Sequence, residues 1–321
     1  EKINRTRKPI LSVDLPSGLM ADTGQWLDTA HGARPNAQRH TLSLLTLKPG
    51  LFTADGRDAA GQVWFDNLGV EPSSEIPPTA WLQASNVDSH ARAHSSHKGS
   101  FGDVMVVGGA PGMAGAAVLA SLAALHGGAG RVFAALLDTS SHSSVTATHP
   151  SLMVRHVDTL DFKNATVVCG CGGADAVRAV LPRVISTAAR LVLDADALNA
   201  VAQDMSLQKL LKQRAARNQP TVLTPHPLEA ARLLGWTTAQ VQSKRIEAAE
   251  QLAAQTGSVV VLKGSGTIVA HPAHTSIVNP TGNALLATAG TGDVLAGLIG
   301  AKMAQGASAF DAACHAVRVH G

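Results

Sequence analysis

Ala289-Gly290-Thr291-Gly292-Asp293 is the stretch around which this 321-residue chain is organised. The residues after it predict a helix, because large apolar side chains recur at the spacing of one helix face, namely at Val294, Leu295, Leu298, Ile299 and Met303. The Gly-Thr-Gly sequence permits a tight turn that points several backbone N–H groups at one place. A helix N-terminus adds about half a positive charge there, so the stretch predicts an anion-binding site at Gly290, Thr291 and Gly292.

Asp293 would lie in the first turn of this helix, beside the place where a phosphate would bind. A carboxylate at that position can accept a proton from a hydroxyl group that attacks phosphorus, which makes Asp293 the candidate catalytic base. The alternative is structural: the glycines open a helix and Asp293 caps it. The stretch alone leaves both interpretations open.

The composition is that of a compact globular protein, with 45% hydrophobic and 15% charged residues. Aromatic residues make up only 3% and Tyr is absent, so we expect a core of Val, Leu and Ala. The net charge of +3 is small and the basic residues are scattered, which argues against a nucleic-acid partner. We also expect a homo-oligomer.

The sequence contains no apolar run of the roughly 18 residues that a membrane span needs, and the start does not resemble a signal peptide. We therefore expect a cytoplasmic protein. Three cysteines cannot build a disulfide framework, and Cys169 and Cys171 are expected to be buried thiols at a strand end. The chain starts with Glu and stops within a helical pattern, so we expect a piece of a longer protein.

Two blocks are expected. In residues 1–70, strands are predicted at Ile10–Val13, Thr41–Leu47 and Gln62–Asp66, too few to bury an independent core. Residues 71–84 are rich in Pro and Ser and read as a linker. Residues 85–321 alternate strands with helices, which predicts an α/β fold: a mostly parallel sheet with helices on both faces and ligands beyond the carboxyl ends of the strands.

Familiar nucleotide motifs are missing. The turn Gly108–Gly115 does not have the Gly-x-Gly-x-x-Gly spacing, and no acidic residue ends the next strand. No Gly-Lys-Ser/Thr occurs either, so the chain lacks a Walker A loop. A nucleotide would have to bind in another way.

Three further stretches follow predicted strands. Asp194 and Asp196 could hold magnesium or could cap a helix. His226, between two prolines, could hydrogen-bond a ligand or belong to a structural turn. The loop Lys263–Thr267 joins two strands through glycines, and its lysine and bare amides would suit a diphosphate, although a plain hairpin is the alternative.

The order of these motifs resembles the ADP-dependent NAD(P)H-hydrate dehydratase family, a branch of the ribokinase-like fold. The matching motifs run from about His97 to the end and are His-Lys-Gly-Ser-Phe-Gly at 97–102, Gly-Gly-x-x-Gly-Met at 108–113, Leu-Asp-Ala-Asp-Ala-Leu-Asn at 193–199, Thr-Pro-His-Pro at 224–227, Leu-Lys-Gly-x-Gly-Thr at 262–267 and Ala-Gly-Thr-Gly-Asp-Val-Leu at 289–295. The chain thus looks like part of a bifunctional repair enzyme.

The resemblance implies a lyase that repairs hydrated NADH and NADPH, S epimer, by phosphorylating the ring hydroxyl with ADP and eliminating phosphate, with Mg2+ as cofactor. Asp293 would activate the hydroxyl. The positions that match the family's substrate contacts are Ala116, Gly172, His226 and Asp293. Those that match its ADP contacts are Lys263, Gly264, Ser265, Gly266, Thr267 and Gly292.

The first block resembles the C-terminal part of the NAD(P)H-hydrate epimerase domain, which is Rossmann-like and holds potassium. The resemblance rests on Asp-Leu-Pro-Ser-Gly at 14–18 and Leu-Lys-Pro-Gly-Leu at 47–51. It implies that Asp14 contacts substrate and that Ser17 ligates K+, although an ordinary turn with an Asx or Ser cap is the alternative for both residues. Around Arg39-His40-Thr41 an acidic residue usual in the family is replaced, and the family's Gly- and Asn-rich loop is not in this sequence, so we expect no epimerase activity from these 321 residues.

Two loops depart from the dehydratase pattern. Ala284–Ala287 replaces Pro-Gly-Met-Ala, and Gly170–Ala174 replaces Gly-Pro-Gly-Leu-Gly. Two other functions remain open at this point. One is a ribokinase-like kinase that uses ATP on a small alcohol, and the other is a non-catalytic nucleotide-binding protein.

Overall fold

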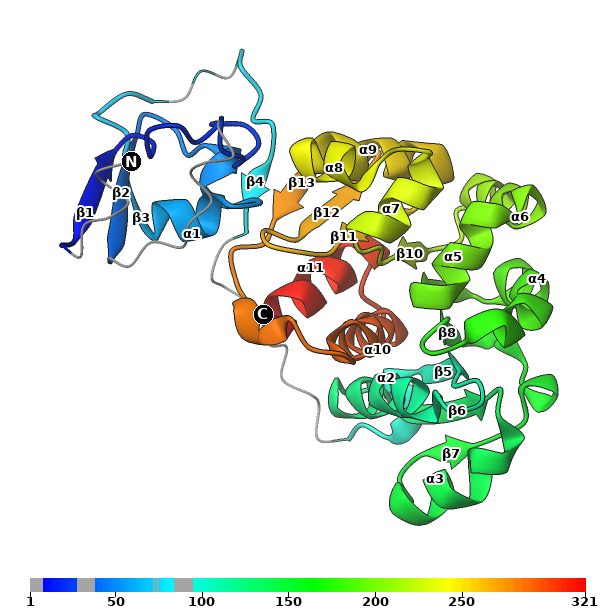
Figure 1. Ribbon diagram of the computed structural model, residues 1–321. Coiled ribbons are helices and arrows are strands. Elements are labelled where there is room, and N and C mark those ends of the chain that lie inside the picture. The colour runs from blue at the N-terminus through cyan, green and yellow to red at the C-terminus, as the bar shows by residue number, and fades with distance from the viewer. Residues whose placement is uncertain (1–7, 28–37, 72, 74, 84–94) are drawn as a thin grey trace.

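The computed structural model describes residues 8–27, 38–71, 73, 75–83 and 95–321, which form a small block and a larger one (Figure 1). The small block is a parallel sheet of order β1-β2-β3 with one short helix. Its elements are β1 Ile10–Val13, β2 Arg39–Leu44, the 3-10 turn η3 Pro49–Leu51, α1 Gly56–Ala60 and β3 Gln62–Asp66. Among the described residues, the buried apolar cluster of this block consists of Leu19, Leu51, Ala59 and Ala60, in keeping with the expectation that the block has little core of its own.

The larger block is built on a ten-stranded sheet of order β4-β13-β12-β11-β10-β9-β8-β5-β6-β7. All its neighbouring strands are parallel except that β12 runs antiparallel to β11 and β13. The strands are β4 Trp81–Leu82, β5 Asp103–Gly108, β6 Arg131–Leu136, β7 Met153–Val154, β8 Thr166–Cys169, β9 Arg190–Leu193, β10 Thr221–Leu223, β11 Val259–Leu262, β12 Ile268–His271 and β13 His274–Val278. Central strands such as β11, Val-Val-Val-Leu, are wholly buried because helices cover both faces.

Helices form a layer on each face of this sheet (Figure 1). α2, α10 and α11 pack on one face, and the other is covered by α4 to α7 and α9. The helices are α2 Ala114–His126, α3 His142–Thr148, α4 Val177–Thr187, α5 Ala195–Gln203, α6 Met205–Ala216, α7 Pro227–Leu234, α8 Thr238–Ser243, α9 Arg245–Thr256, α10 Thr291–Ala304 and α11 Ala309–His320. The buried residues are mainly Val, Leu and Ala, as the composition predicts.

Most predicted elements of the larger block are confirmed, and the differences are local. The pattern of residues 239–256 predicts one helix, whereas the structure has two, because the backbone of Lys244 leaves the helical region between α8 and α9. Helix α5, directly after Asp194, was not predicted. In the small block, the strand expected at Thr41–Leu47 ends at Leu44, and the next residue, Leu45, has a positive φ of 61°. Trp81 and Leu82, which fall in the predicted linker, form β4 and pair with β13.

The parallel strands end at one edge of the sheet, and the loops that follow them carry the predicted site residues. Asp194 follows β9, His226 lies in the loop after β10 and Lys263 follows β11. Placing functional side chains at this edge is the general behaviour of open α/β sheets.

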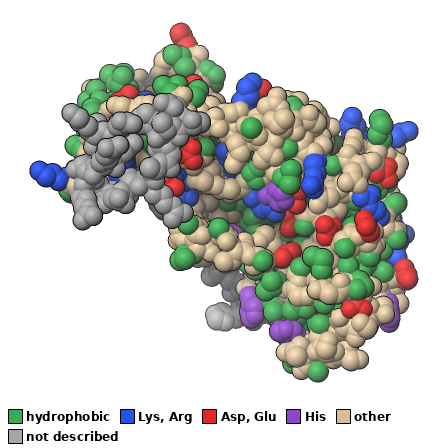
Figure 2. Space-filling view, in the orientation of Figure 1, with side chains coloured by type: hydrophobic (Ala, Val, Ile, Leu, Met, Phe, Trp, Pro, Cys, Tyr) green, Lys and Arg blue, Asp and Glu red, His purple; other side chains and the backbone are tan. Residues whose placement is uncertain are grey.

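The distribution of surface charge and the lengths of the helices both bear on function. Basic and acidic side chains are interspersed on the face seen in Figure 2, in keeping with the small net charge. No helix in the described part of the chain is both long and apolar enough to cross a membrane.

Candidate active site

Asp293 lies in the first turn of α10, as the sequence predicts. Gly290 precedes the helix with a φ of +91°, a left-handed conformation that glycine adopts without strain. The first turn of a helix leaves backbone N–H groups without intrahelical partners, so those of Thr291, Gly292 and Asp293 can serve an anion. Burial, and after it the charge of Asp194, raises the pKa of the half-buried Asp293 carboxyl to about 6. A carboxyl group with such a pKa is suited to accept a proton near neutral pH.

A buried ion pair lies beside this helix start. The Lys263 ammonium is 2.7 Å from Oδ1 of Asp194, and that carboxylate also accepts a hydrogen bond of 2.7 Å from the Thr224 hydroxyl. A Cβ placed on Gly292 would lie 3.2 Å from Lys263 Nζ, so the positive charge lies directly against the Gly-Thr-Gly turn. The lysine predicted to serve a diphosphate is therefore in place, but its charge is shared with Asp194.

Cys171 lies within the same cluster. Its sulfur and carboxylate oxygens of Asp194 and Asp293 are all within 4.8 Å of one another, and this is a group of residues that could hold a metal ion. Complete burial raises the pKa of the Cys171 thiol well above its usual value, so the thiol keeps its proton. The sequence correctly predicts buried thiols at Cys169 and Cys171 but gives no sign that one of them faces the candidate base.

The backbone of the loop Lys263–Thr267 is hydrogen-bonded to the buried side chain of Arg245. Arg245 is only 4% exposed. Its Nη2 donates to the carbonyl oxygens of Leu262, Lys263 and Gly266 at 3.2, 3.2 and 3.4 Å. Three carbonyl groups that face one cation fix the path of the backbone. The predicted ADP-binding loop is thus a rigid element, with Ser265 exposed at its tip.

Two of the predicted substrate positions are in contact. A Cβ added at Gly172 would lie 2.8 Å from the Cβ of Ala116, and Gly172 itself has a φ of +59°. The Gly172 carbonyl accepts a hydrogen bond of 2.7 Å from Ala110 N, which ties the loop after β8 to the glycine turn after β5. Ala116 and Gly172 therefore form one wall at the carboxyl edge of the sheet.

His226 caps α7. Its Nδ1 accepts hydrogen bonds from the backbone N–H groups of Leu228 and Glu229 at 3.1 and 3.4 Å, while Nε2 lies 3.3 Å from Glu229 Oε1. Burial raises the pKa of the Glu229 carboxyl to about 7. The structural role named as an alternative for His226 is present, and its ring, 45% exposed, is still open to a ligand.

Asp194 and Asp196 make different interactions. Asp194 Oδ1 is engaged by Lys263 and Thr224, whereas Asp196 Oδ2 accepts a hydrogen bond of 2.8 Å from Ala174 N. One oxygen of each carboxylate is left without a hydrogen bond among the described residues. Oxygen ligands of this kind fit Mg2+, which commonly takes only one or two carboxylates and binds phosphate and water as well.

In the small block, Asp14 forms an ion pair with Lys48 and accepts a hydrogen bond of 3.0 Å from Leu44 N. Asp14 has a φ of +68° at the start of the predicted turn, and Ser17 is exposed within it. The hydrogen bond from Lys48 holds the pKa of the Asp14 carboxyl below its usual value. The potassium and substrate roles of these residues remain predictions.

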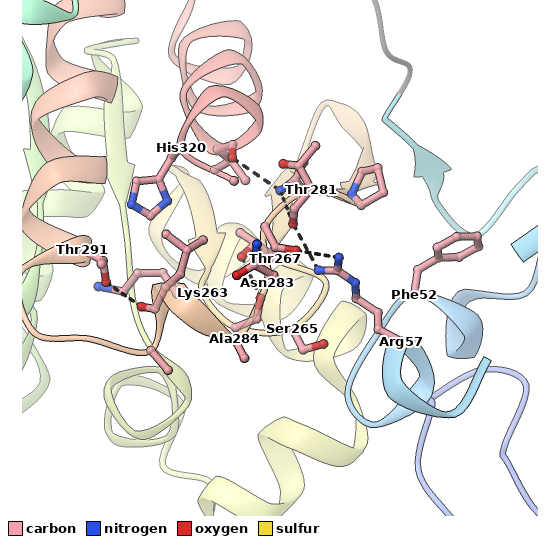
Figure 3. A pocket seen from close by; sticks show the side chains of 18 of the residues that line it. Phe52, Arg57, Lys263, Ser265, Thr267, Thr281, Asn283, Ala284, Thr291 and His320 are labelled. Atoms are coloured by element: carbon pink, nitrogen blue, oxygen red, sulfur yellow. Dashed lines mark hydrogen bonds between the residues drawn. The ribbon is translucent and has the colours of Figure 1, made fainter. Parts of the chain in front are cut away.

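A cavity of about 680 Å³ opens in front of the start of α10. Thr291, Gly292 and Lys263 line one end, and residues 279–284 and the loop 263–267 line its sides (Figure 3). Its volume is within the range of small-molecule sites. The turn that the sequence predicts to bind an anion therefore borders a space large enough for a nucleotide.

Residues 104–321 match the family model described as NAD(P)H-hydrate dehydratase. The chain belongs to the NAD(P)H-hydrate dehydratase family. Residues 1–50 match a second model, the YjeF-related protein N-terminus. The dehydratase family assignment agrees with the resemblance drawn from the motifs.

Curated relatives agree with this family assignment. The bifunctional NAD(P)H-hydrate repair enzyme of Escherichia coli is 37% identical over 333 residues, covering 98% of this chain and 60% of that protein. The ADP-dependent (S)-NAD(P)H-hydrate dehydratase of Neisseria meningitidis is 46% identical, covering 72% of this chain and 79% of that protein. The chain thus spans about 60% of the length of the bifunctional relative.

Solved structures confirm the ribokinase-like fold. The ADP/ATP-dependent NAD(P)H-hydrate dehydratase of Bacillus subtilis, co-crystallised with ATP and Mg2+, matches with a TM-score of 0.62 and 31% identity over 72% of this chain and 82% of that one. A ribokinase-like superfamily protein of Enterococcus faecalis matches with a TM-score of 0.61 and 25% identity over 72% and 81%.

Sequence reasoning missed four residues of this dehydratase-family site: Cys171, Thr224, Glu229 and Arg245. Glu229 could have been found, because an acidic residue three positions after a helix cap forms a capping box. The other three act through tertiary contacts with residues 17 to 122 positions away in the sequence, and no local pattern marks them.

Proposed function

We propose that this chain dehydrates the S epimer of hydrated NADH and NADPH in an ADP-dependent reaction, releasing AMP and phosphate. The observation that carries the proposal is Asp293, a carboxyl group with a pKa of about 6 in the first turn of α10. It directly follows Thr291 and Gly292, which line a cavity large enough for a nucleotide. Membership of the dehydratase family supplies the substrate class. The printed name of the Neisseria relative supports ADP and the S epimer.

The chemistry starts with phosphoryl transfer. Asp293 accepts the proton of the ring hydroxyl while the hydroxyl oxygen forms a bond to the terminal phosphorus of ADP. The bond from that phosphorus to the bridging oxygen breaks, which releases AMP. The backbone amides of Gly290, Thr291 and Gly292 stabilise the charge on the transferring group. Lys263, against Gly292, adds positive charge at the same place.

Elimination follows. The ring carbon–oxygen bond breaks, phosphate leaves with the electron pair, and a proton is lost from the neighbouring ring carbon as the double bond re-forms. Ala116, Gly172 and His226 would position the hydrated nicotinamide, while the loop Lys263–Thr267 holds ADP. Bound Mg2+ would neutralise phosphate charge. Asp194 and Asp196 each keep one oxygen that could hold it.

The remaining parts of the proposal concern the cellular location, the oligomeric state and the small block. We place the activity in the cytoplasm and in a homo-oligomer, as expected from the sequence. For the small block, potassium at Ser17 and a substrate contact at Asp14 would require that further ligands complete the site.

The test mixes the protein with hydrated NADH, ADP and Mg2+ and follows the absorbance band of reduced nicotinamide. Recovery of the band is expected, and Asp293→Asn should abolish it while ADP still binds in calorimetry. Asp175→Asn is the matched control and should leave turnover unchanged, because the Asp175 side chain is 97% exposed and pairs with Arg178.

Other outcomes would overturn the proposal. Phosphorylation of a small alcohol by ATP, with no recovery of the nicotinamide band, would establish a ribokinase-like kinase. Binding of ADP without turnover of either kind would establish a non-catalytic nucleotide-binding protein. Full activity of Asp293→Asn would remove the catalytic role of this residue.

A further inference from the structure

The small block contributes to the cavity in front of α10. Phe52 and Arg57 of this block line one end, and Thr291 and Gly292 of α10 line the other (Figure 3). Between them lie the loop 263–267 and the segment 279–284. A phosphate bound at the α10 amides would therefore leave the rest of a nucleotide directed towards the small block.

The two blocks are joined at this point by hydrogen bonds. Arg57 donates from Nη1 to the Thr281 carbonyl oxygen at 3.1 Å and from Nη2 to the Gly282 carbonyl oxygen at 2.7 Å. On the opposite side of the cavity, a Cβ added at Gly266 would collide with the Phe52 carbonyl oxygen. The small block thus touches both the segment 279–284 and the Lys263–Thr267 loop.

The segment that Arg57 holds has another anchor. The Thr281 hydroxyl donates to the Arg318 carbonyl oxygen at 3.0 Å, and Asn279 Nδ2 donates to the Val317 carbonyl oxygen at 3.4 Å, both in α11. Arg57 therefore adds a support from the small block to this wall. Two hydrogen bonds from one planar guanidinium fix direction as well as distance.

We propose that the small block forms one wall of the nucleotide site and that Arg57 is a positioning residue, which holds Thr281 and Gly282 against the nucleoside half of ADP. The inference rests on the proposed function for the identity of the nucleotide. It assigns the small block a role in the dehydratase reaction that is separate from any epimerase chemistry. Binding of the diphosphate end depends on α10 and Lys263 and is independent of Arg57.

The test measures KM for ADP, kcat and the melting temperature for Arg57→Ala, for Arg57→Lys and for the control Arg217→Ala, an exposed arginine directly after α6. Loss of two charged hydrogen bonds that order a binding wall should raise KM for ADP by roughly five- to tenfold. The value of kcat should stay within about twofold, because Asp293 is untouched. Arg57→Lys should recover part of the affinity, since it keeps the charge and one direct contact.

A second measurement separates the two ends of the nucleotide. Inorganic pyrophosphate should inhibit the wild type and Arg57→Ala equally, whereas ADP should bind the variant more weakly. Unchanged KM, a fall in kcat alone, or equal weakening of pyrophosphate and ADP would overturn the inference. If Arg57→Ala does not fold, Arg57→Lys carries the same comparison.

The outcome is distinguishable from failure of the proposed function. If wild type binds ADP but shows no turnover, the proposed function fails, and calorimetry with ADP on the full chain still compares wild type with Arg57→Ala. Equal ADP affinity in that comparison would overturn the inference that the small block forms a wall of the nucleotide site. If the wild type binds no ADP, both proposals fail.

Discussion

The ammonium of Lys263 lies 2.7 Å from Oδ1 of Asp194, in an ion pair whose carboxylate side chain is only 2% exposed. The pair joins the end of β9 to the end of β11, which are separated in the sheet by β10. It also brings a positive charge under Gly292, where the backbone amides of α10 begin. One buried pair therefore supports both the fold and the anion-binding turn.

Replacing Lys263 by Met should leave Asp194 as an uncompensated buried charge. Removing one partner of a buried ion pair typically costs about 3–5 kcal/mol of the free energy of unfolding. Urea denaturation followed by circular dichroism measures this change. The double variant Lys263→Met/Asp194→Asn is the control and should regain much of the loss, and equal stability of the two variants would show that the pair does not carry the effect.

The pKa of Asp293, about 6, predicts the acid limb of the rate profile. The base must be ionised to accept a proton, so kcat/KM should rise with pH through about 6 and level off above it. Initial rates between pH 5 and pH 8 measure this limb. A flat profile across that range would contradict the assignment of Asp293 as the base.

The same raised pKa predicts a change in stability. The folded carboxyl binds its proton more tightly than the unfolded one, whose pKa is near 3.8, so the free energy of unfolding should fall as pH rises from about 4 to about 6. Asp293→Asn removes this cost and should be more stable than wild type above pH 7, by about 1–2 kcal/mol after allowance for partial solvent screening. Melting curves at pH 4.5 and pH 7.5 provide the comparison, and the gain should be much smaller at the lower pH.

Cys171 should tune the same carboxyl group. Its protonated thiol donates a hydrogen bond that lowers the pKa of Asp293, although burial dominates and keeps that pKa raised. Cys171→Ala removes the donor and should move the acid limb of kcat/KM to higher pH, whereas Cys171→Ser keeps a donor and should move it less. Identical profiles for wild type and Cys171→Ala would show that the thiol serves packing alone.

Replacing Arg214 should destabilise the fold strongly, although this residue lies outside the candidate active site. This arginine is 2% exposed and donates to the carbonyl oxygens of Ile185 and Ala188 at 2.8 and 2.7 Å and to the Thr221 hydroxyl at 3.0 Å. Arg214→Met leaves these acceptors buried without a donor and should cost about 3 kcal/mol or more. Arg217, directly after the end of the same helix, is exposed, and Arg217→Ala should change stability by less than about 0.5 kcal/mol in the same denaturation experiment.

Local patterns in the sequence were sufficient to predict most elements of the larger block. Strands such as Val259–Leu262 are short apolar runs bounded by polar loops, and helix α10 shows its apolar face at regular spacing. Patterns failed where the element was short or its capping was unusual. α5 begins directly after β9 at Ala195, whose φ of +47° is rare for a residue other than glycine. β4 has two residues and gains its partner, β13, from almost 200 positions away.

The sequence by itself determined the mostly parallel α/β sheet, the dehydratase resemblance and the place of Asp293 in the first turn of a helix, because these depend on apolar periodicity, glycine turns and motif order. Tertiary structure alone decided what surrounds Asp293: the Cys171 thiol, the Lys263–Asp194 pair and the buried Arg245 below the loop. Tertiary structure alone also decided the contact of Arg57 with the cavity wall. The physical reason is that burial, pKa and ion pairing depend on distances between residues far apart in the chain, and those distances are set only when the strands align at a common edge.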